Sequence, residues 1–259
     1  MSEHPGGLNR PAKPLARLTV VRREQLHPDL VRVWFSTEGF QAGEFSDSYV
    51  KLLFDDHGPV STPPAEGERP TTRTYSVRTI EDDLLALDFV VHGDEGLAAP
   101  WAAAAEPGEV VLARGPGGAW SPRTEADFHL FLGDESALPA IAAGLERLPT
   151  DARGLVVIEA CEHTLDLRHP DGVEVRWLVR GDEDYRAERL ADQVRDLDWA
   201  ALGDVSIFAH GERGSMRALR PVFTPLGLDK DRLSLSGYWA RGRVEDQFQA
   251  EKRTEVGRV

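Results

Sequence analysis

Short runs in which apolar and polar residues alternate fill the first half of the chain. Glycine, proline and acidic residues separate these runs, as is typical of turns between strands. Because no long helical pattern lies between them, we predict an antiparallel barrel of six strands. One helix is expected beside the barrel, at residues 96–108, with Pro100 near its start and Glu-Pro-Gly at its end. The expected strands cover residues 15–24, 30–37, 49–54, 73–80, 84–93 and 108–115.

The pattern changes near Pro122, after which apolar strands alternate with helical segments. In the first of these helices, Leu138, Ile141 and Leu145 recur on one face. Alternating strands and helices predict an α/β domain with a mostly parallel sheet. Strands are expected at 128–134, 154–160, 173–179, 204–211 and 232–239, and helices at 135–149, 186–197, 212–223 and 240–252. We therefore expect a flexible N-terminus at 1–14, a barrel domain at 15–122 and an α/β domain at 123–259 that closes with a helix.

Composition narrows the classes of function. The 259 residues include 30 Lys and Arg against 44 Asp and Glu, a formal net charge of −14, which disfavours general binding to nucleic acids or anionic membranes. A single cysteine, Cys161, excludes an intrachain disulfide, a structural zinc knuckle and an all-cysteine iron–sulfur cluster. The eight histidines show no metal-ligand spacing, so no metal site is predicted. Neither a secretory leader nor a membrane span is visible, and a cytoplasmic protein is expected.

A barrel followed by an α/β domain suits a relay in which one domain holds a flavin and the other presents a nicotinamide. On the strand that contains Arg73, Tyr75 and Ser76, the guanidinium could pair with a pyrophosphate. The Tyr75 ring, on the same face as Arg73, could stack on the flavin, and Ser76 could reach its ring edge. The alternative is structural: Tyr75 in the core and Arg73 solvated or ion-paired.

A second candidate for phosphate binding follows the strand that ends at His92. Small residues at Gly96, Ala98 and Ala99 open the next helix, and free N–H groups at a helix start favour an anion. His92 either touches the cofactor or caps the turn.

In the second half, a strand, a glycine and a helix start occur together at Gly133, and again at Gly211 and Glu212. Ligands of α/β sheets bind at the carboxyl ends of the strands, but the full G-x-G-x-x-G is absent, so ordinary tight turns remain an alternative. Glu159 ends another strand. It either accepts hydrogen bonds from a ribose, which favours NADH, or is a surface carboxylate.

Taken together, these stretches resemble the siderophore-interacting protein family, the FAD-containing ferric-siderophore reductases related to ferredoxin–NADP reductases. The resemblance runs from about Leu15 to about Phe248. It rests on the order of seven motifs: YVKLLF, RTYSVR, LDFVVHGDEGLAAPWA, GPGG, GDESALPAI, HGERGSMRALR and GYWARGRVED.

The resemblance implies a six-stranded Greek-key FAD-binding barrel and a C-terminal Rossmann-like NAD(P)H domain. The residues implied to hold FAD are Arg73, Thr74, Tyr75, Ser76, Asp88, Val90, His92, Gly96, Ala98 and Ala99. Those implied to face the nicotinamide dinucleotide or the cleft are Gly133, Asp134, Glu135, Ala137, Gly211, Glu212 and Trp239. Glu159 is added to the second set by the argument from the strand end.

Basic residues around the flavin are implied to attract anionic ferric siderophores. Lys51 matches one such position, and Arg241 or Arg243 another. Relatives often carry an arginine where this chain has Gly117, and the change leaves open whether substrate preference differs. Ser76 stands where threonine is commoner, and Leu97 and Ala99 replace a proline and a small hydroxyl residue.

The implied activity is the reduction of siderophore-bound Fe³⁺ to Fe²⁺ with electrons from NADH or NADPH through FAD, which releases the iron. No catalytic side chain is required, because the flavin carries the electrons. Two alternatives stay open: a general NAD(P)H-flavin or ferredoxin reductase, and a siderophore carrier without enzymatic activity. Ferredoxin as donor, the siderophore class and the oligomeric state are also open.

Overall fold

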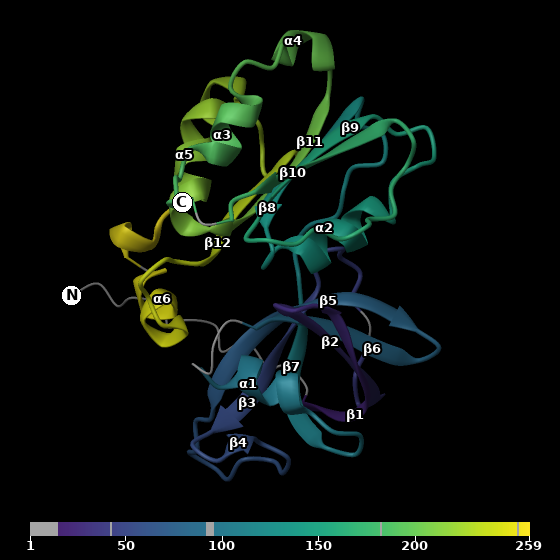
Figure 1. The fold of residues 1–259 in the computed structure, drawn as a ribbon, viewed down its shortest axis with the longest axis vertical. Coiled ribbons are helices and arrows are strands. Elements are labelled where there is room, and N and C mark those ends of the chain that lie inside the picture. Colours follow the sequence, from purple (N-terminus) through teal and green to yellow (C-terminus); the bar gives the residue numbers. More distant parts are fainter. Residues whose placement is uncertain (1–14, 42, 92–95, 182, 253) are drawn as a thin grey trace, which may run out of the picture.

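The computed structural model describes residues 15–41, 43–91, 96–181, 183–252 and 254–259. It consists of two lobes, an N-terminal β-lobe and a C-terminal α/β-lobe (Figure 1). No helix among these residues is both long and apolar enough to cross a membrane.

The β-lobe is a closed barrel in which every neighbouring pair of strands is antiparallel. The strand order is β3-β5-β6-β2-β1-β7, and pairing of β3 with β7 closes it. The prediction of a six-stranded antiparallel barrel is therefore confirmed. A two-residue strand, β4, was not predicted and extends the edge at β3. The strands are β1 (Leu15–His27), β2 (Leu30–Glu38), β3 (Tyr49–Asp55), β4 (Gly58–Pro59), β5 (Thr71–Glu81), β6 (Leu84–Val90) and β7 (Val110–Gly117).

Alternation places one set of apolar side chains inside the barrel, among them Val33, Phe35 and Phe89. Helix α1 (Ala98–Ala104) packs on this core through Ala98, Ala102 and Trp101. The Trp101 ring lies 5.8–6.3 Å from the rings of Phe35, Phe54 and Phe89, so α1 packs against the barrel interior. Helix α1 is shorter than the predicted span of 96–108.

The α/β-lobe contains a five-stranded sheet of order β10-β9-β8-β11-β12, and all four strand pairs are parallel. This confirms the Rossmann-like arrangement. Strands β9 and β11 are buried along their whole length, as expected for parallel strands covered on both faces. The strands are β8 (Phe128–Asp134), β9 (Gly154–Ala160), β10 (Val173–Val179), β11 (Val205–Glu212) and β12 (Leu233–Trp239).

Helix α2 covers one face of this sheet, and α3 with α5 covers the other (Figure 1). The core on the α2 side includes Leu30 of the barrel, with Leu26 and Val90 packed against it, so the hydrophobic core runs across the two lobes. The helices are α2 (Leu138–Leu145), α3 (Arg189–Val194), α4 (Trp199–Leu202), α5 (Arg213–Phe223) and α6 (Glu245–Glu251), with 3-10 turns at Thr224–Leu226 and Glu255–Gly257.

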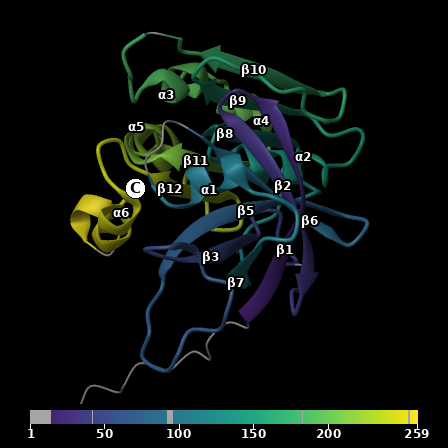
Figure 2. The ribbon, with the colours of Figure 1, turned by 60° about the horizontal axis from the view of Figure 1, so that its bottom comes forward.

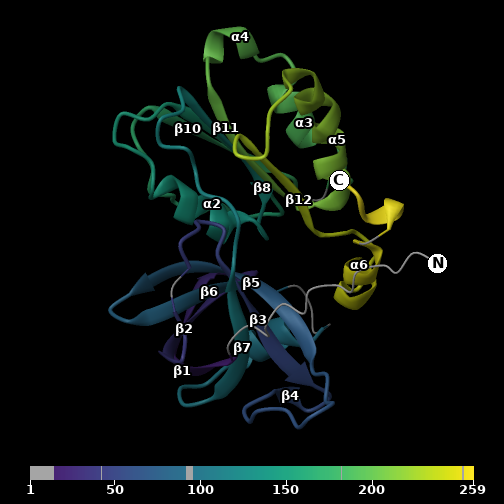
Figure 3. The same ribbon diagram turned by 180° about the vertical axis from the view of Figure 1, so that it is seen from behind.

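Two further features position the site. The turn between β1 and β2 reaches the α/β-lobe (Figure 2). There the His27 ring stacks on that of His163. Helix α6 and the C-terminus lie beside α5, at the side where the lobes meet (Figure 3). The closing helix was predicted to start at residue 240, but it starts at Glu245 because Gly242 has a φ of +69°, which breaks the helix.

Candidate functional site

On the barrel side, the site begins with β5, where Arg73 is partly buried with 18% of its side chain exposed. Its guanidinium donates 3.1 Å to the Asp246 carboxylate of α6 and 3.0 Å to the Thr72 carbonyl. Asp246 is 72% exposed, so Arg73 has an acidic partner that solvent or another anion can replace. Thr74, the next residue, is exposed.

Tyr75 faces the barrel interior, with its ring 4.3 Å from that of Phe89. Burial raises the pKa of its hydroxyl group. The structural alternative for Arg73 and Tyr75 is thus partly realised: the ring packs on the core and the guanidinium is ion-paired. Their predicted contacts with FAD stay predictions.

Ser76 lies between the two lobes. Burial raises the pKa of the Tyr238 hydroxyl group on β12, and the nearby Ser76 side chain lowers it. Ser76 and Trp239, predicted separately as flavin and cleft residues, therefore lie at one junction between β5 and β12.

Asp134 is the centre of the site on the α/β side. At the carboxyl end of β8, its Oδ2 accepts from the Glu212 main-chain N–H at 2.7 Å and from Trp239 Nε1 at 2.8 Å. Its Oδ1 accepts from the Ser136 N–H at 2.9 Å. Burial raises the pKa of Asp134, and these hydrogen bonds oppose that rise. Asp134, Glu212 and Trp239 are therefore brought together, although 105 residues separate the first from the last.

Glu212 caps the start of α5 by accepting from the main-chain N–H groups of Gly214 and Ser215. Its second oxygen accepts from the Arg241 N–H at 3.0 Å, so the start of α5 is tied to the segment after β12. The Tyr185 hydroxyl group also donates to Glu212. The Glu212 carboxylate therefore has a structural role as an N-cap, independently of any contact with a nucleotide.

Two glycines allow this close packing. A Cβ on Gly133 would lie 2.6 Å from the His210 carbonyl and 2.8 Å from the Ala137 Cβ, at the start of α2. Gly211 has a φ of +152°, and a Cβ there would lie 2.7 Å from Asp134 Oδ2. Both glycines are thus required by packing, independently of any ligand.

Of the other two predicted acidic residues of this edge, Glu135 is partly buried and Glu159 is buried. Glu135 accepts from the Cys161 N–H at 3.2 Å, and burial raises its pKa. Glu159 is the next-to-last residue of β9 and lies 3.9 Å from Arg180, and burial raises its pKa while the nearby Arg189 lowers it. The carboxyl edge of the sheet therefore combines several carboxylates with two arginines.

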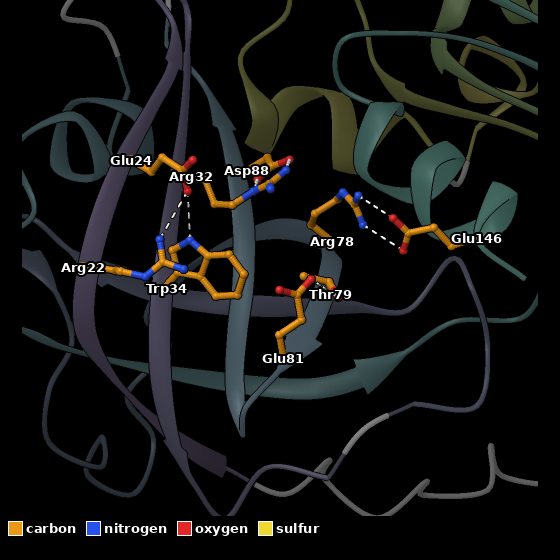
Figure 4. A network of polar contacts seen from close by, with 9 residues as sticks. All are labelled: Arg22, Glu24, Arg32, Trp34, Arg78, Thr79, Glu81, Asp88 and Glu146. Carbon is orange, nitrogen blue, oxygen red and sulfur yellow. Dashed lines mark hydrogen bonds and ion pairs between the residues drawn. The ribbon is translucent and has the colours of Figure 1, made fainter. Parts of the chain in front are cut away.

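On β6, the predicted FAD residues already have protein partners. Asp88 forms a two-bond ion pair with Arg32, at 2.6 and 2.8 Å, across the β2–β6 pair (Figure 4). Val90 packs against the core shared by the lobes. Their predicted contacts with FAD are not tested by this arrangement.

The segment that leads into α1 is only partly described, because His92 lies outside the described residues. Gly96 has a φ of +91°, and no described residue comes within 4 Å of a Cβ built there. Ala98 is 2% exposed and its side chain belongs to the barrel core, so only its main chain could contact a ligand. Ala99 is partly exposed.

The three candidate substrate residues differ in their surroundings. Lys51 lies opposite Thr74 in the β3–β5 pair, beside the Arg73 strand position, and is close enough to lower the pKa of Lys252. Arg243 donates 2.7 Å to Glu251. The Arg241 guanidinium lies 5.2 Å from the centre of the Tyr185 ring.

The structure accounts for Gly117. A Cβ built there would overlap the ring of Tyr49, which lies opposite in the β3–β7 pair. The tyrosine thus fills the space that a side chain at 117 would need, and the loss of a basic residue there is coupled to the residue at position 49.

Sequence reasoning missed Asp246, Tyr238 and Tyr185, which contact Arg73, Ser76 and Glu212 respectively. Tyr238 directly precedes Trp239 in the GYWARGRVED motif, so the motif pointed to its position but not to its role. The other two contacts arise only from the tertiary fold.

The residues present fit a flavin dinucleotide. Arg73 offers a guanidinium with an exchangeable acidic partner, and Ser76 offers a hydroxyl group. Gly96 offers an accessible main chain, since a Cβ on this glycine would have no neighbour within 4 Å among the described residues.

Comparisons with known proteins agree with this fit. Residues 19–120 match the family model of the siderophore-interacting FAD-binding domain, and residues 126–242 match that of the siderophore-interacting protein. The chain is 32% identical to the ferric vibriobactin reductase ViuB of Vibrio cholerae, over 91% of this chain and 93% of that protein. It is 31% identical to the NADPH-dependent ferric-chelate reductase of Escherichia coli, over 86% of this chain and 91% of that protein.

Among solved structures, the siderophore-interacting protein SipS from Aeromonas hydrophila superposes with a TM-score of 0.82 at 27% identity, over 94% of this chain and 98% of that chain. The two family models together cover most of the sequence, including both lobes. The chain belongs to the siderophore-interacting protein family, with an FAD-binding barrel as its N-terminal lobe.

Proposed function

We propose that this protein reduces the iron of ferric siderophores with electrons drawn from NADH or NADPH through FAD. The observation that carries the proposal is the junction of the lobes, where Ser76 of the FAD-binding barrel lies near Tyr238 and the adjacent Trp239 donates to Asp134. Candidate flavin residues and candidate nicotinamide residues thus meet at one place. Two relatives, named for reduction of ferric vibriobactin and of ferric chelates, support the choice of substrate.

FAD supplies the step between a two-electron donor and a one-electron acceptor. In this proposal Arg73 holds its phosphates, Tyr75 and Ser76 hold its ring system, and the main chain at Gly96 and Ala98 approaches the phosphates. Asp88 and Val90 shape the neighbouring wall. A nicotinamide donor would place the protein in the cytoplasm.

On the other side of the junction, Asp134 holds the Trp239 indole in place and also the start of α5 through Glu212. We assign this edge, from Gly133 to Ala137 together with Glu159 and Gly211, to the nicotinamide dinucleotide. Trp239 is 38% exposed, so it can shield the junction and still move when a donor binds.

Lys51 is the basic residue that we assign to the siderophore. Burial lowers the pKa of the neighbouring Lys252 and the Lys51 charge lowers it further, while Glu245 raises it. In this proposal the ammonium group of Lys51 attracts an anionic ferric complex and orients it without making bonds. Arg241 is assigned to the same surface, and Arg243 supports it through Glu251.

The proposal is tested anaerobically with FAD-loaded protein, NADH or NADPH, ferric siderophores of different ligand class, and a chelator that colours on binding Fe²⁺. We expect bleaching of the flavin by at least one nicotinamide, followed by Fe²⁺ capture that requires the protein. Bleaching without Fe²⁺ capture would point to a general flavin or ferredoxin reductase. Siderophore binding by a protein that takes up no FAD would point to a carrier.

A further inference from the structure

A cluster of potential metal ligands lies outside the proposed flavin site. His27 ends β1, Asp29 lies in the turn before β2, and His163 follows β9 in the other lobe. One ligand atom from each residue lies within 4.8 Å of the others. All three side chains are partly buried.

The three side chains do not form a hydrogen-bond network with one another. The two imidazole rings stack with their centres 4.9 Å apart and their planes at 17°. Asp29 Oδ2 lies 3.7 Å from His163 Nδ1, beyond hydrogen-bond distance. His163 Nδ1 is buried and has no hydrogen-bond partner among the described residues.

The turn itself is held firmly. The Asp29 carbonyl accepts from the Val91 N–H at 2.8 Å, and the Asp29 N–H donates 3.2 Å to His27 Nδ1. Two of the three groups are therefore fixed on one hairpin, and His163 faces them from the α/β-lobe. An ion bound by all three residues would replace the 3.2 Å hydrogen bond between the Asp29 N–H and His27 with a contact that spans the lobes.

From this geometry we propose that His27, Asp29 and His163 bind a divalent first-row transition-metal ion. Two imidazoles and one carboxylate suit Zn²⁺, Co²⁺, Ni²⁺ and Fe²⁺, whereas Mg²⁺ and Ca²⁺ prefer sets made of oxygen alone. In a tetrahedral site with bonds of about 2.0–2.1 Å, ligand atoms lie about 3.4 Å apart. Side-chain rotations that move the ligand atoms by about an ångström would therefore bring the three groups to bonding distance of one ion.

Charged groups of both signs lie beside the loop that carries His163. Glu135 accepts from the Cys161 N–H at 3.2 Å, and Arg180 donates to Cys161 Sγ at 2.7 Å. The proposed ion would tie the β1–β2 turn to the loop after β9.

The test uses tag-free, FAD-loaded protein, titrated with Co²⁺ and followed by the visible absorption of the bound ion and by calorimetry. We expect one Co²⁺ per chain, displaced by Zn²⁺ and unaffected by excess Mg²⁺. His27→Ala and His163→Ala should each weaken Co²⁺ binding at least about tenfold, since changes even to residues that only support ligands cost 10–100-fold.

His169→Ala is the matched control, because His169 is exposed in the same loop and should bind no ion. If His27→Ala does not fold, Asp29→Asn removes a ligand and keeps the main-chain bonds of the turn. Zn²⁺ should raise the melting temperature of the wild type and of His169→Ala, and not that of His163→Ala. Absence of saturable Co²⁺ binding, or binding that survives in both His163→Ala and Asp29→Asn, overturns the proposal. Neither readout depends on the reductase activity.

Discussion

Arg73 is the residue on which the proposed flavin site depends most directly. Its guanidinium is paired with an exposed carboxylate, and charge-assisted hydrogen bonds contribute about 1.5–3 kcal/mol. Arg73→Ala should therefore weaken FAD binding by about 10- to 150-fold, measured by the change in flavin fluorescence on titration.

Arg69→Ala provides the control, because Arg69 is exposed in the loop before the same strand. Asp246→Asn should leave FAD affinity unchanged or higher, since it removes the competing anion. An unchanged dissociation constant for Arg73→Ala would contradict the assignment of this residue to the phosphates.

His210 makes the stability of the fold depend on pH. It is 4% exposed, stacks 3.9 Å from Phe208, and bonds Ser234 through Nε2 at 2.8 Å. Burial lowers its pKa to about 3, from 6.5 in the unfolded chain. Between these values the unfolded chain binds a proton that the folded protein does not, so acid destabilises the fold below pH 6.5.

The free energy of unfolding should accordingly fall by up to about 1.4 kcal/mol for each pH unit below 6.5 from this residue alone. His210→Gln should reduce the slope of unfolding free energy against pH, measured in urea between pH 4.5 and 6.5, by up to one proton. His57→Gln, at an exposed histidine, serves as the control. Equal slopes in the wild type and His210→Gln would show that the buried imidazole does not carry this dependence.

At the scale of elements, α6 is held by a carboxylate between two arginines. Glu251 accepts from Arg213 at 2.6 Å and from Arg243 at 2.7 Å, and these bonds lower its pKa. Phe248 of α6 is buried, with 1% of its surface exposed, and its ring lies under the Arg213 guanidinium. This stabilisation is present at neutral pH and is lost as the pH falls through the lowered pKa of Glu251.

Glu251→Gln should therefore loosen α6 without unfolding the lobes. We expect amide hydrogen exchange in α6 at pH 7 to become at least about twofold faster, while exchange in β9 and β11 stays the same. Glu255→Gln, at an exposed glutamate of the same segment, should have no effect. Unchanged exchange in α6 of Glu251→Gln would mean that the aromatic contact alone holds the helix.

The sequence predicted those strands and helices in which apolar residues recur at regular spacing. Alternation located all six barrel strands, and the apolar face of Leu138, Ile141 and Leu145 located α2. Helix α4, four residues long, and strand β4, two residues long, are too short to show a period. The predicted start of α6 was wrong because its position depends on the backbone at Gly242.

The site was harder to predict than the fold. The carboxyl ends of β8 and β11 could be expected to meet, and Asp134 does bond Glu212. Local sequence contains no signal that pairs Arg73 with Asp246, or His27 with His163, because those contacts depend on how the lobes are packed. Ala98 differs from these cases. The sequence singled it out as an FAD residue, yet its side chain is buried in the barrel core.

The two lobes share a hydrophobic core and an ion pair. Arg78 of β5 bonds Glu146, just after α2, at 2.7 and 3.2 Å, with 15% and 32% of the side chains exposed (Figure 4). A double-mutant cycle with Arg78→Ala and Glu146→Ala, measured by urea unfolding, should give a coupling of about 0.5–1 kcal/mol.

The Glu174–Arg176 pair is the comparison for this cycle, because it is also held by two bonds but is more exposed, at 60% and 40%, and lies within one strand. Its coupling should be smaller, since solvent screens it more. A larger coupling for Glu174–Arg176 than for Arg78–Glu146 would contradict a role of the latter in joining the lobes.

In the proposed function, flavin held at the junction of the lobes passes electrons to siderophore-bound iron. The most direct measurement loads the protein with FAD, reduces the flavin under argon with one equivalent of dithionite, and mixes it with a ferric siderophore and an Fe²⁺ chelator. We expect the oxidised flavin absorption to return together with the capture of two Fe²⁺ per flavin, faster than with free reduced FAD and slower in Lys51→Ala. A flavin that stays reduced in the presence of every ferric siderophore, or that reacts no faster than free FAD, would contradict it.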